Sequence, residues 1–233
     1  MTEEDVIHGI RKCWSYSQAL HIDQLFTNPA PLEPSEEFRD AALSPTAAYE
    51  EVYLTGLAGG EYNILLADYA FLQFGRSADD AVRYAYYPNP FLGASREAVA
   101  ELADLRSYVD EELMSYEEFL QRVAELRFSQ HPPLIRYENS EEQYVELTHP
   151  CSHLHIGHHA NNRWPLRRML TPHAFALMVF KYYYLDFWTE ADHITFGDQE
   201  FDLDELLVRA KQDCRVLPDH LFTDRAARQF FTD

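Results

Sequence analysis

The chain has 233 residues, of which 39 are acidic and 19 are Lys or Arg, so its formal net charge is −20 at pH 7. This length suits one domain. A content of 46% hydrophobic residues is enough for a substantial core and excludes a disordered chain. The negative charge excludes long-range attraction to nucleic acid, which depends on Lys and Arg neutralising phosphates. It indicates a well-solvated surface, or an acidic surface that docks on a basic partner.

The composition also bears on the compartment. No apolar run approaches the roughly 20 residues that a bilayer-spanning helix needs, so no membrane association is predicted. The acidic start from Met1 to Asp5 argues against a secretory signal peptide. The three cysteines, Cys13, Cys151 and Cys214, are far apart and odd in number, which fits a reducing compartment rather than a disulfide framework. We therefore expect a cytoplasmic protein.

The predicted elements begin with a helix over residues 2–21, because Thr2 can cap it and apolar residues follow at helical spacing. Residues 28–47 are rich in proline and acid, and predict a surface connection. The remaining predicted elements are a hairpin of strands at 61–75 and 80–87, helices at 95–106 and 116–128, strands at 133–137 and 143–147 joined by a turn at 138–142, a strand at 151–156, a turn at Gly197-Asp198, and helices at 172–188, 203–213 and 217–233.

These elements indicate an α+β fold in which an antiparallel sheet packs against helices. The helix at 172–188 is apolar nearly all round, so we expect it to be central. Residues 1–233 are interpreted as a single domain. It comprises an N-terminal helix and connection (1–45), a core (46–190) and a C-terminal helical extension (191–233).

The most informative stretch is residues 147–185, which contain no Asp or Glu. This stretch has a formal charge of +4, whereas the rest of the chain has 15 basic against 39 acidic residues. It also holds six of the eleven histidines, namely His149, His153, His155, His158, His159 and His173. An acid-free, histidine-rich stretch in so acidic a chain indicates a place that holds an anion or a metal ion.

Within residues 151–156, strand alternation would turn Leu154 and Ile156 toward the core and His153 and His155 toward the other face. The following loop, residues 158–170, carries further histidines and arginines and returns to a helix that begins after Thr171. A helix N-terminus presents free N–H groups. These groups could all converge on one anion.

The first chemical interpretation is metal-independent phosphodiester cleavage. His149 and His153 would act as general acid and base, because the ordinary histidine pKa lies near neutrality. Arg163 would stabilise the charge that develops on the phosphoryl oxygens. The candidate binding residues beside these three are Ser152, Asn161 and Arg167.

The second interpretation is zinc, held by His153 and His155 together with Cys151 or with His158 and His159. No standard zinc spacing such as Cys-x2-Cys is present, and acidic outer partners are absent nearby, so neither a metal nor a cofactor is predicted. The third interpretation is structural: the histidines bond backbone carbonyls and the arginines pair with acids elsewhere.

The chain resembles a prokaryotic family, the domain of unknown function 2290, whose members are mostly hypothetical proteins. The resemblance covers about residues 45–190. It rests on His149-Pro150-x-Ser152-His153-Leu154-x-x-Gly157, Asn161-x-Arg163-x-Pro165, Leu170-Thr171-Pro172-x-x-Phe175, Tyr62-Asn63 and Tyr87-Pro88-x-Pro90.

The resemblance carries no established activity, but it ranks the candidate residues. The family pattern contains His149, Ser152, His153, Asn161 and Arg163. The remaining histidines and arginines of the loop lie off the pattern, which weakens the zinc interpretation and favours a His/His/Arg site. Proteins of this kind also resemble members of mobile or phage-defence gene neighbourhoods, which implies a protein partner encoded nearby.

Two hypotheses follow. In the first, the protein is a cytoplasmic RNase-like effector whose His/His/Arg site acts on a nucleic acid or nucleotide. In the alternative, it is a non-enzymatic accessory or adaptor subunit, similar to an antitoxin, whose acidic surface binds a basic partner protein. Acidic residues clustered on one face would favour the adaptor, and acidic residues around a cationic cleft would favour the enzyme.

Overall fold

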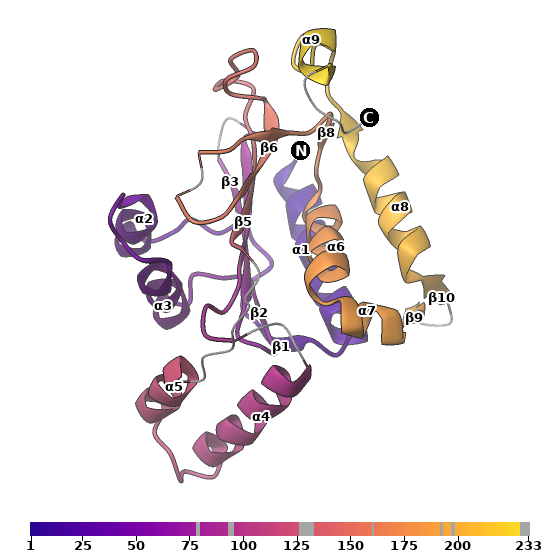
Figure 1. Ribbon diagram of the computed structural model, residues 1–233. Coiled ribbons are helices and arrows are strands. Elements are labelled where there is room, and N and C mark those ends of the chain that lie inside the picture. The colour runs from indigo at the N-terminus through magenta and orange to yellow at the C-terminus, as the bar shows by residue number, and fades with distance from the viewer. Residues whose placement is uncertain are drawn as a thin grey trace.

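The computed structural model describes residues 1–77, 80–92, 96–125, 133–159, 161–191, 193–196 and 199–228 (Figure 1). Within these residues an antiparallel sheet of seven strands forms a meander in which each strand pairs with the next along the chain. Its strands are β1 (Asp23–Phe26), β2 (Ile64–Leu66), β3 (Phe71–Arg76), β4 (Val82–Tyr87), β5 (Ile135–Asn139), β6 (Ser152–Ile156) and β7 (Trp164–Pro165). Two small ribbons pair β8 (Arg168–Met169) with β11 (Arg215–Val216), and β9 (His193–Phe196) with β10 (Gln199–Asp202).

Helices lie on both faces of the sheet, so the predicted α+β fold is confirmed (Figure 1). On one face lie α1 (Glu3–Ala19), α6 (Pro172–Tyr183), α7 (Leu185–Ala191) and α8 (Leu203–Asp213), with the short α9 (Asp224–Ala227) beyond them. On the other face lie α2 (Glu36–Leu43) and α3 (Tyr49–Gly59). The hairpin of α4 (Arg96–Asp110) and α5 (Tyr116–Glu125) extends from one end of the molecule.

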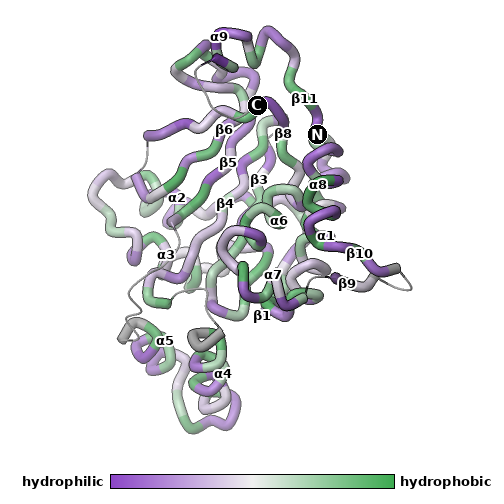
Figure 2. The backbone as a smooth tube through the Cα atoms, turned by 45° about the vertical axis from the view of Figure 1, so that its right-hand side comes forward, coloured by the Kyte–Doolittle hydropathy of each residue, from purple (hydrophilic) through white to green (hydrophobic). Residues whose placement is uncertain are grey.

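The central apolar helix is confirmed as α6, which packs against α1 and the sheet (Figure 2). It begins as its sequence predicts, with Thr171 accepting a hydrogen bond from the backbone of Ala174 and Pro172 in the first turn. The helix ends earlier than expected, because the backbone leaves the helical conformation at Tyr184. The buried hydroxyl of Tyr184 donates to the carboxylate of Asp68 at 2.8 Å, which fixes this residue against the sheet.

The sheet is buried on both faces. On the α6 side, Phe175 contacts Phe74, Tyr84 and Tyr137 of three successive strands. On the other side, a second apolar cluster joins the aromatic residues of β3 and β4 to those of α2 and α3, namely Phe71, Tyr87, Phe38 and Tyr53. Polar residues of β4, β5 and β6, namely Arg83, Arg136, Glu138, His153 and His155, lie on this second face.

Several predicted elements were wrong in detail. The strand expected at 61–75 is two strands, because Asp68 accepts a hydrogen bond from the backbone of Ala70 and turns the chain between β2 and β3. No strand forms at 143–147, where Leu147 has a positive φ of 69° and only Val145 bridges to His149. The connection at 28–47 contains α2, and neither α3 nor β1 was predicted.

The predicted C-terminal helix is limited to α9 within the described part of residues 217–233. The expected helix start at Ser95, the helix end at 126–128 and the turn at Gly197-Asp198 lie outside the described residues. In the part of the chain that the structure describes, every helix is too short or too polar to cross a bilayer.

Candidate functional site

The strands β4, β5 and β6 place two rows of polar residues on the sheet face that α2 and α3 share. Cross-strand register puts Arg83 opposite Glu138, and Glu138 opposite His153. The neighbouring row on the same face puts Arg136 opposite His155. Side chains of directly opposed residues interact across an antiparallel pair, so strand pairing alone gathers these groups.

Both ring nitrogens of His153 have partners. Its Nδ1 lies 2.7 Å from the carbonyl oxygen of Pro150, and its Nε2 lies 3.1 Å from Nε2 of His155. Because a carbonyl only accepts, Nδ1 of His153 carries the proton, and Nε2 is left with a lone pair. Burial, and then the neighbouring His155, lowers the pKa of His153 to about 4. The ring is therefore neutral at pH 7.

Glu138 completes a three-residue cluster with the two histidines. Its Oε2 lies 3.9 Å from Nε2 of His153 and 4.0 Å from Nε2 of His155, while its Oε1 lies 3.5 Å from Nε of Arg83. Burial raises the pKa of this carboxyl, but Arg83 and then His155 outweigh it and hold the pKa below its ordinary value. Glu138 is therefore ionised at neutral pH, beside two imidazoles.

Buried nitrogens without partners include two next to this cluster, on Arg136 and His149. Of the four buried side-chain nitrogens that lack a hydrogen-bond partner among the described residues, three are Nε of Arg136, Nε of Arg163 and Nδ1 of His149. The ring of His149 stands 5.0 Å from that of His153, at 81° to it. Burial, and then the charge of Arg83, lowers the pKa of Arg136, and Arg163 adds to this effect. Unpaired buried donors cost free energy, so the two arginine Nε groups favour an anionic acceptor, and Nδ1 of His149 can donate to the same acceptor when it carries the ring proton.

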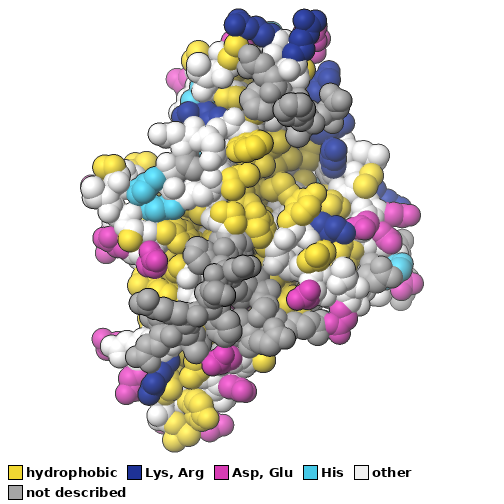
Figure 3. Space-filling view, viewed as in Figure 1, with side chains coloured by type: hydrophobic (Ala, Val, Ile, Leu, Met, Phe, Trp, Pro, Cys, Tyr) yellow, Lys and Arg dark blue, Asp and Glu magenta, His cyan; other side chains and the backbone are white. Residues whose placement is uncertain are grey.

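A pocket of about 310 Å³ opens beside Arg136 on the same face. It is lined by Ala42, Leu43, Pro45, Val52, Tyr87, Leu134, Arg136, His158, His159 and Asn161. Nε2 of His158 and Nε2 of His159 lie 2.8 and 3.0 Å from the carbonyl oxygen of Ala47, which ties the loop after β6 to the start of α3. Figure 3 shows histidine side chains at the surface beside α2.

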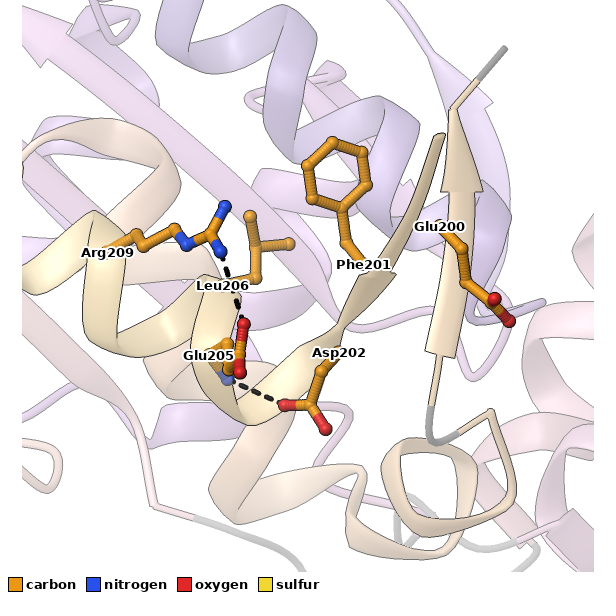
Figure 4. Close-up of a pocket in the computed structure, with 6 residues that line it drawn as sticks. All are labelled: Glu200, Phe201, Asp202, Glu205, Leu206 and Arg209. Carbon is orange, nitrogen blue, oxygen red and sulfur yellow. Dashed lines mark hydrogen bonds and ion pairs between the residues drawn. The ribbon is translucent and has the colours of Figure 1, made fainter. Parts of the chain in front are cut away.

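A second pocket, between β10 and α8, has a different character (Figure 4). Asp202 accepts a hydrogen bond from the backbone of Glu205 at 2.7 Å, and Arg209 donates to the Glu205 carboxylate at 3.2 Å. Its polar groups serve to cap and brace α8. With Glu200 it is lined by three acids and one base, which disfavours an anion.

The structure brings some of the predicted site residues together. The rings of His149 and His153 are adjacent, and Arg163 is close enough for its charge to contribute to the lowered pKa of Arg136. Asn161 lies at the pocket beside His158 and His159.

The other two predicted residues lie elsewhere. Ser152 faces the α6 side, where its hydroxyl is 2.9 Å from the hydroxyl of Tyr137 and donates to the carbonyl of Arg168 at 2.8 Å. Arg167 is exposed, and its backbone carbonyl accepts from Leu217 outside this face. Neither side chain reaches the histidine cluster.

Sequence reasoning missed Arg136 and Glu138, and it placed His155 off the pattern. Alternation correctly put the two histidines on one face. Both histidines are buried, however, whereas Leu154 and Ile156, which were expected to face the core, are half-buried. Cys151, a candidate zinc ligand, directs its thiol to the Asn139 amide oxygen at 3.9 Å and is packed in the α6-side core.

Comparison with known families agrees with the resemblance seen in the sequence. The model of a family described as an uncharacterized conserved protein, DUF2290, matches residues 30–224. The chain belongs to this family. No curated protein and no solved structure matches the DUF2290 chain.

Some residues of the motifs that carried the resemblance have structural roles. The side-chain amide of Asn63 donates to the carbonyls of Asn28 and Ala30, both at 2.8 Å, and its oxygen accepts from the backbone of Phe74 at 2.8 Å. Asn63 therefore attaches the 28–47 connection to β3. In the histidine part of the pattern, Ser152 and His153 also bond backbone carbonyls, as the structural interpretation expects. Nδ1 of His149 and Nε of Arg163 have no such partner among the described residues.

Proposed function

We propose that this DUF2290 protein binds a phosphodiester-bearing ligand on the face of β4, β5 and β6, and acts on it as an RNase-like enzyme. The observation that carries the proposal is the set of unpartnered buried nitrogens on Arg136, Arg163 and His149. A phosphodiester supplies charged acceptor oxygens that would satisfy them. The adjacent pocket has room for the attached nucleoside.

The proposal assigns different roles to the basic residues. Arg136 and Arg163 would donate to the phosphate oxygens, and the charge that develops there during cleavage would strengthen these bonds. His149 would transfer a proton, because its Nδ1 is unoccupied. His153 would orient the site rather than transfer protons, because both its nitrogens are engaged.

The test uses a fluorescently labelled single-stranded RNA oligonucleotide at low ionic strength, with binding followed by anisotropy and cleavage followed on a gel. Low salt is needed because a net charge of −20 opposes the approach of nucleic acid. We expect R136Q and R163Q each to weaken binding about 10-fold or more, since a charge-assisted hydrogen bond contributes roughly 1.5–3 kcal/mol.

The matched control is R209Q, which removes an exposed arginine that pairs with Glu205 on α8. It should bind RNA as the wild type does. H149N should retain binding and lose cleavage. Equal RNA binding by wild type, R136Q and R163Q would refute the proposal.

One observation favours the adaptor as a second candidate. The segment 96–125, which forms the α4–α5 hairpin, has nine acidic residues against three basic ones. Among the side chains that the structure describes there, the exposed acids are Glu101, Asp104, Asp110, Glu111, Glu112, Glu117 and Glu118. Leu113 at the tip is 71% exposed. An acidic, projecting hairpin with an apolar tip suits a basic protein partner.

This candidate is tested by co-expressing the chain with the product of the neighbouring gene and measuring co-elution by size exclusion. We expect E111K/E112K to abolish co-elution and to leave the fold intact. E142K/D219K makes the same charge change at exposed positions elsewhere and should have no effect. Co-elution that survives E111K/E112K would exclude the hairpin as the binding surface.

A further inference from the structure

We propose that Glu138, His153 and His155 form a three-ligand site for a divalent transition-metal ion, with Zn²⁺ as the expected type. One candidate ligand atom from each residue lies within 4.8 Å of the other two. The inference goes beyond the proposed function, because the binding of an ion to these residues does not depend on RNA.

The spacing of the two imidazoles fits a metal ion. Two nitrogens that bind one zinc ion tetrahedrally lie about 3.3 Å apart, since each is about 2.0–2.1 Å from the metal. The Nε2 atoms of His153 and His155 are 3.1 Å apart. Glu138 Oε2, at 3.9 and 4.0 Å, would need to move by roughly half an ångström to complete the site.

The surroundings orient the three ligands. The Pro150 carbonyl holds the Nδ1 proton of His153, so the lone pair on Nε2 faces the cluster. A backbone carbonyl in this position is a common outer partner of metal-binding histidines. Arg83 lies near Oε1 of Glu138, which leaves Oε2 directed at the histidines.

The ligand set also indicates the class of ion. Two imidazoles and one carboxylate suit Zn²⁺, Fe²⁺ or Mn²⁺ rather than Ca²⁺ or Mg²⁺. Three protein ligands leave a coordination position open, as in catalytic rather than structural zinc sites. An ion here would lie beside Arg136, which is opposite His155 in the sheet, and near His149, whose ring is 5.0 Å from that of His153. In that position it could polarise a phosphoryl oxygen.

The competing explanation is a hydrogen bond between the two imidazoles, in which Nε2–H of His155 donates to Nε2 of His153. This bond satisfies both nitrogens without a metal. The hydrogen bond between the imidazoles does not require Glu138, whereas the metal site requires the negative charge of its carboxylate. The two explanations therefore differ in the effect of E138Q, which preserves the shape of the side chain and removes the charge.

The experiment is isothermal titration calorimetry of the full chain with ZnCl₂, after the protein has been stripped with a chelator and dialysed. We expect one zinc ion per chain with a dissociation constant below about 1 μM. E138Q and H155Q should each weaken binding by more than about 100-fold, since losing even an outer partner costs 10–100-fold. Zinc should raise the melting temperature of the wild type and not that of E138Q.

The matched control is H193Q, which removes an exposed histidine 4.0 Å from Asp202, a surface pair that could hold zinc weakly. H193Q should bind zinc as the wild type does. Melting curves without metal show whether each variant folds. The inference would be overturned if the folded wild type did not bind zinc, or if folded E138Q and H155Q bound zinc with the affinity of the wild type. Because no RNA is present, this outcome is independent of any failure to bind RNA.

Discussion

The Nε2 atoms of His153 and His155 lie 3.1 Å apart on one face of β6, and both side chains are almost completely buried. Two buried imidazoles beside a carboxylate are costly in a sheet whose other positions are mostly apolar. The arginines around them have unpaired nitrogens, which adds to the cost. A local loss of folding free energy of this kind is typical of residues that serve binding or catalysis rather than stability.

Arg136 should therefore lower the free energy of unfolding while it contributes to RNA binding. We expect R136M to raise the free energy of unfolding by about 1 kcal/mol, because it retains the apolar stem and removes a half-buried guanidinium whose buried Nε has no partner. The same variant should lose RNA binding. Urea denaturation measures the first effect, and the exposed substitution R209M is the control. A fall in stability of similar size would mean that Arg136 has a structural role.

Asn63 should be among the most important polar residues for the fold. N63A removes two donated bonds and one accepted bond, and leaves the buried N–H of Phe74 and the half-buried carbonyl of Ala30 without these partners. We expect a loss of about 2–4 kcal/mol in the free energy of unfolding. N28A removes one exposed bond to the backbone of Ala30 and should cost less than about 1 kcal/mol. Equal losses for both variants would contradict this account.

Asp68 should make the protein less stable as the pH rises. Burial raises the pKa of this carboxyl to about 6, although bonds from Ala70 and Tyr184 oppose the rise. The native state therefore binds more protons than the unfolded state between about pH 4 and pH 6, so the stability contribution of Asp68 falls over this window. The full effect is about 3 kcal/mol.

The test compares the wild type with D68N, whose amide can bond both the backbone of Ala70 and the hydroxyl of Tyr184. The stability of D68N relative to the wild type should increase from pH 4 to pH 6 and then level off. A difference that is constant with pH would show that the carboxyl titrates normally.

His173, in the first turn of α6, should have the opposite pH dependence. Burial, and then the charge of Lys12, lowers its pKa to about 4, so the unfolded state binds the extra proton between about pH 4 and pH 6.5. The stabilisation is complete above pH 6.5 and is lost as the pH falls toward 4, by about 3 kcal/mol. H173Q should show a shallower loss in chemical denaturation measured across this range. Parallel curves for the two proteins would contradict the prediction.

The elements that the sequence predicted correctly have local causes. The caps at Thr2 and at Thr171-Pro172 define the starts of α1 and α6 from neighbouring residues alone. The period of two in residues 153–155 likewise puts both histidines on one face. The same alternation puts Ser152 on the opposite face, so its inclusion in the site neglected a signal that the sequence contained.

The residues that sequence reasoning missed depend on tertiary pairing. Glu138 meets His153 only through the register of β5 against β6, and residues 138–142 had been assigned to a turn. Arg136 faces the site for the same reason. Where the helix breaks, the side chain of Tyr184 bonds Asp68, 116 residues earlier in the chain. Neither register nor long-range bonding can be read from one sequence by propensity and periodicity.

The most direct test of the account is an anomalous difference map, recorded at the zinc absorption edge from crystals of the full chain grown with zinc. We predict a peak about 2.0–2.2 Å from Nε2 of His153, Nε2 of His155 and Oε2 of Glu138. A map without density there, or with a peak only at the surface beside His193 and Asp202, would contradict the metal site at the centre of this face.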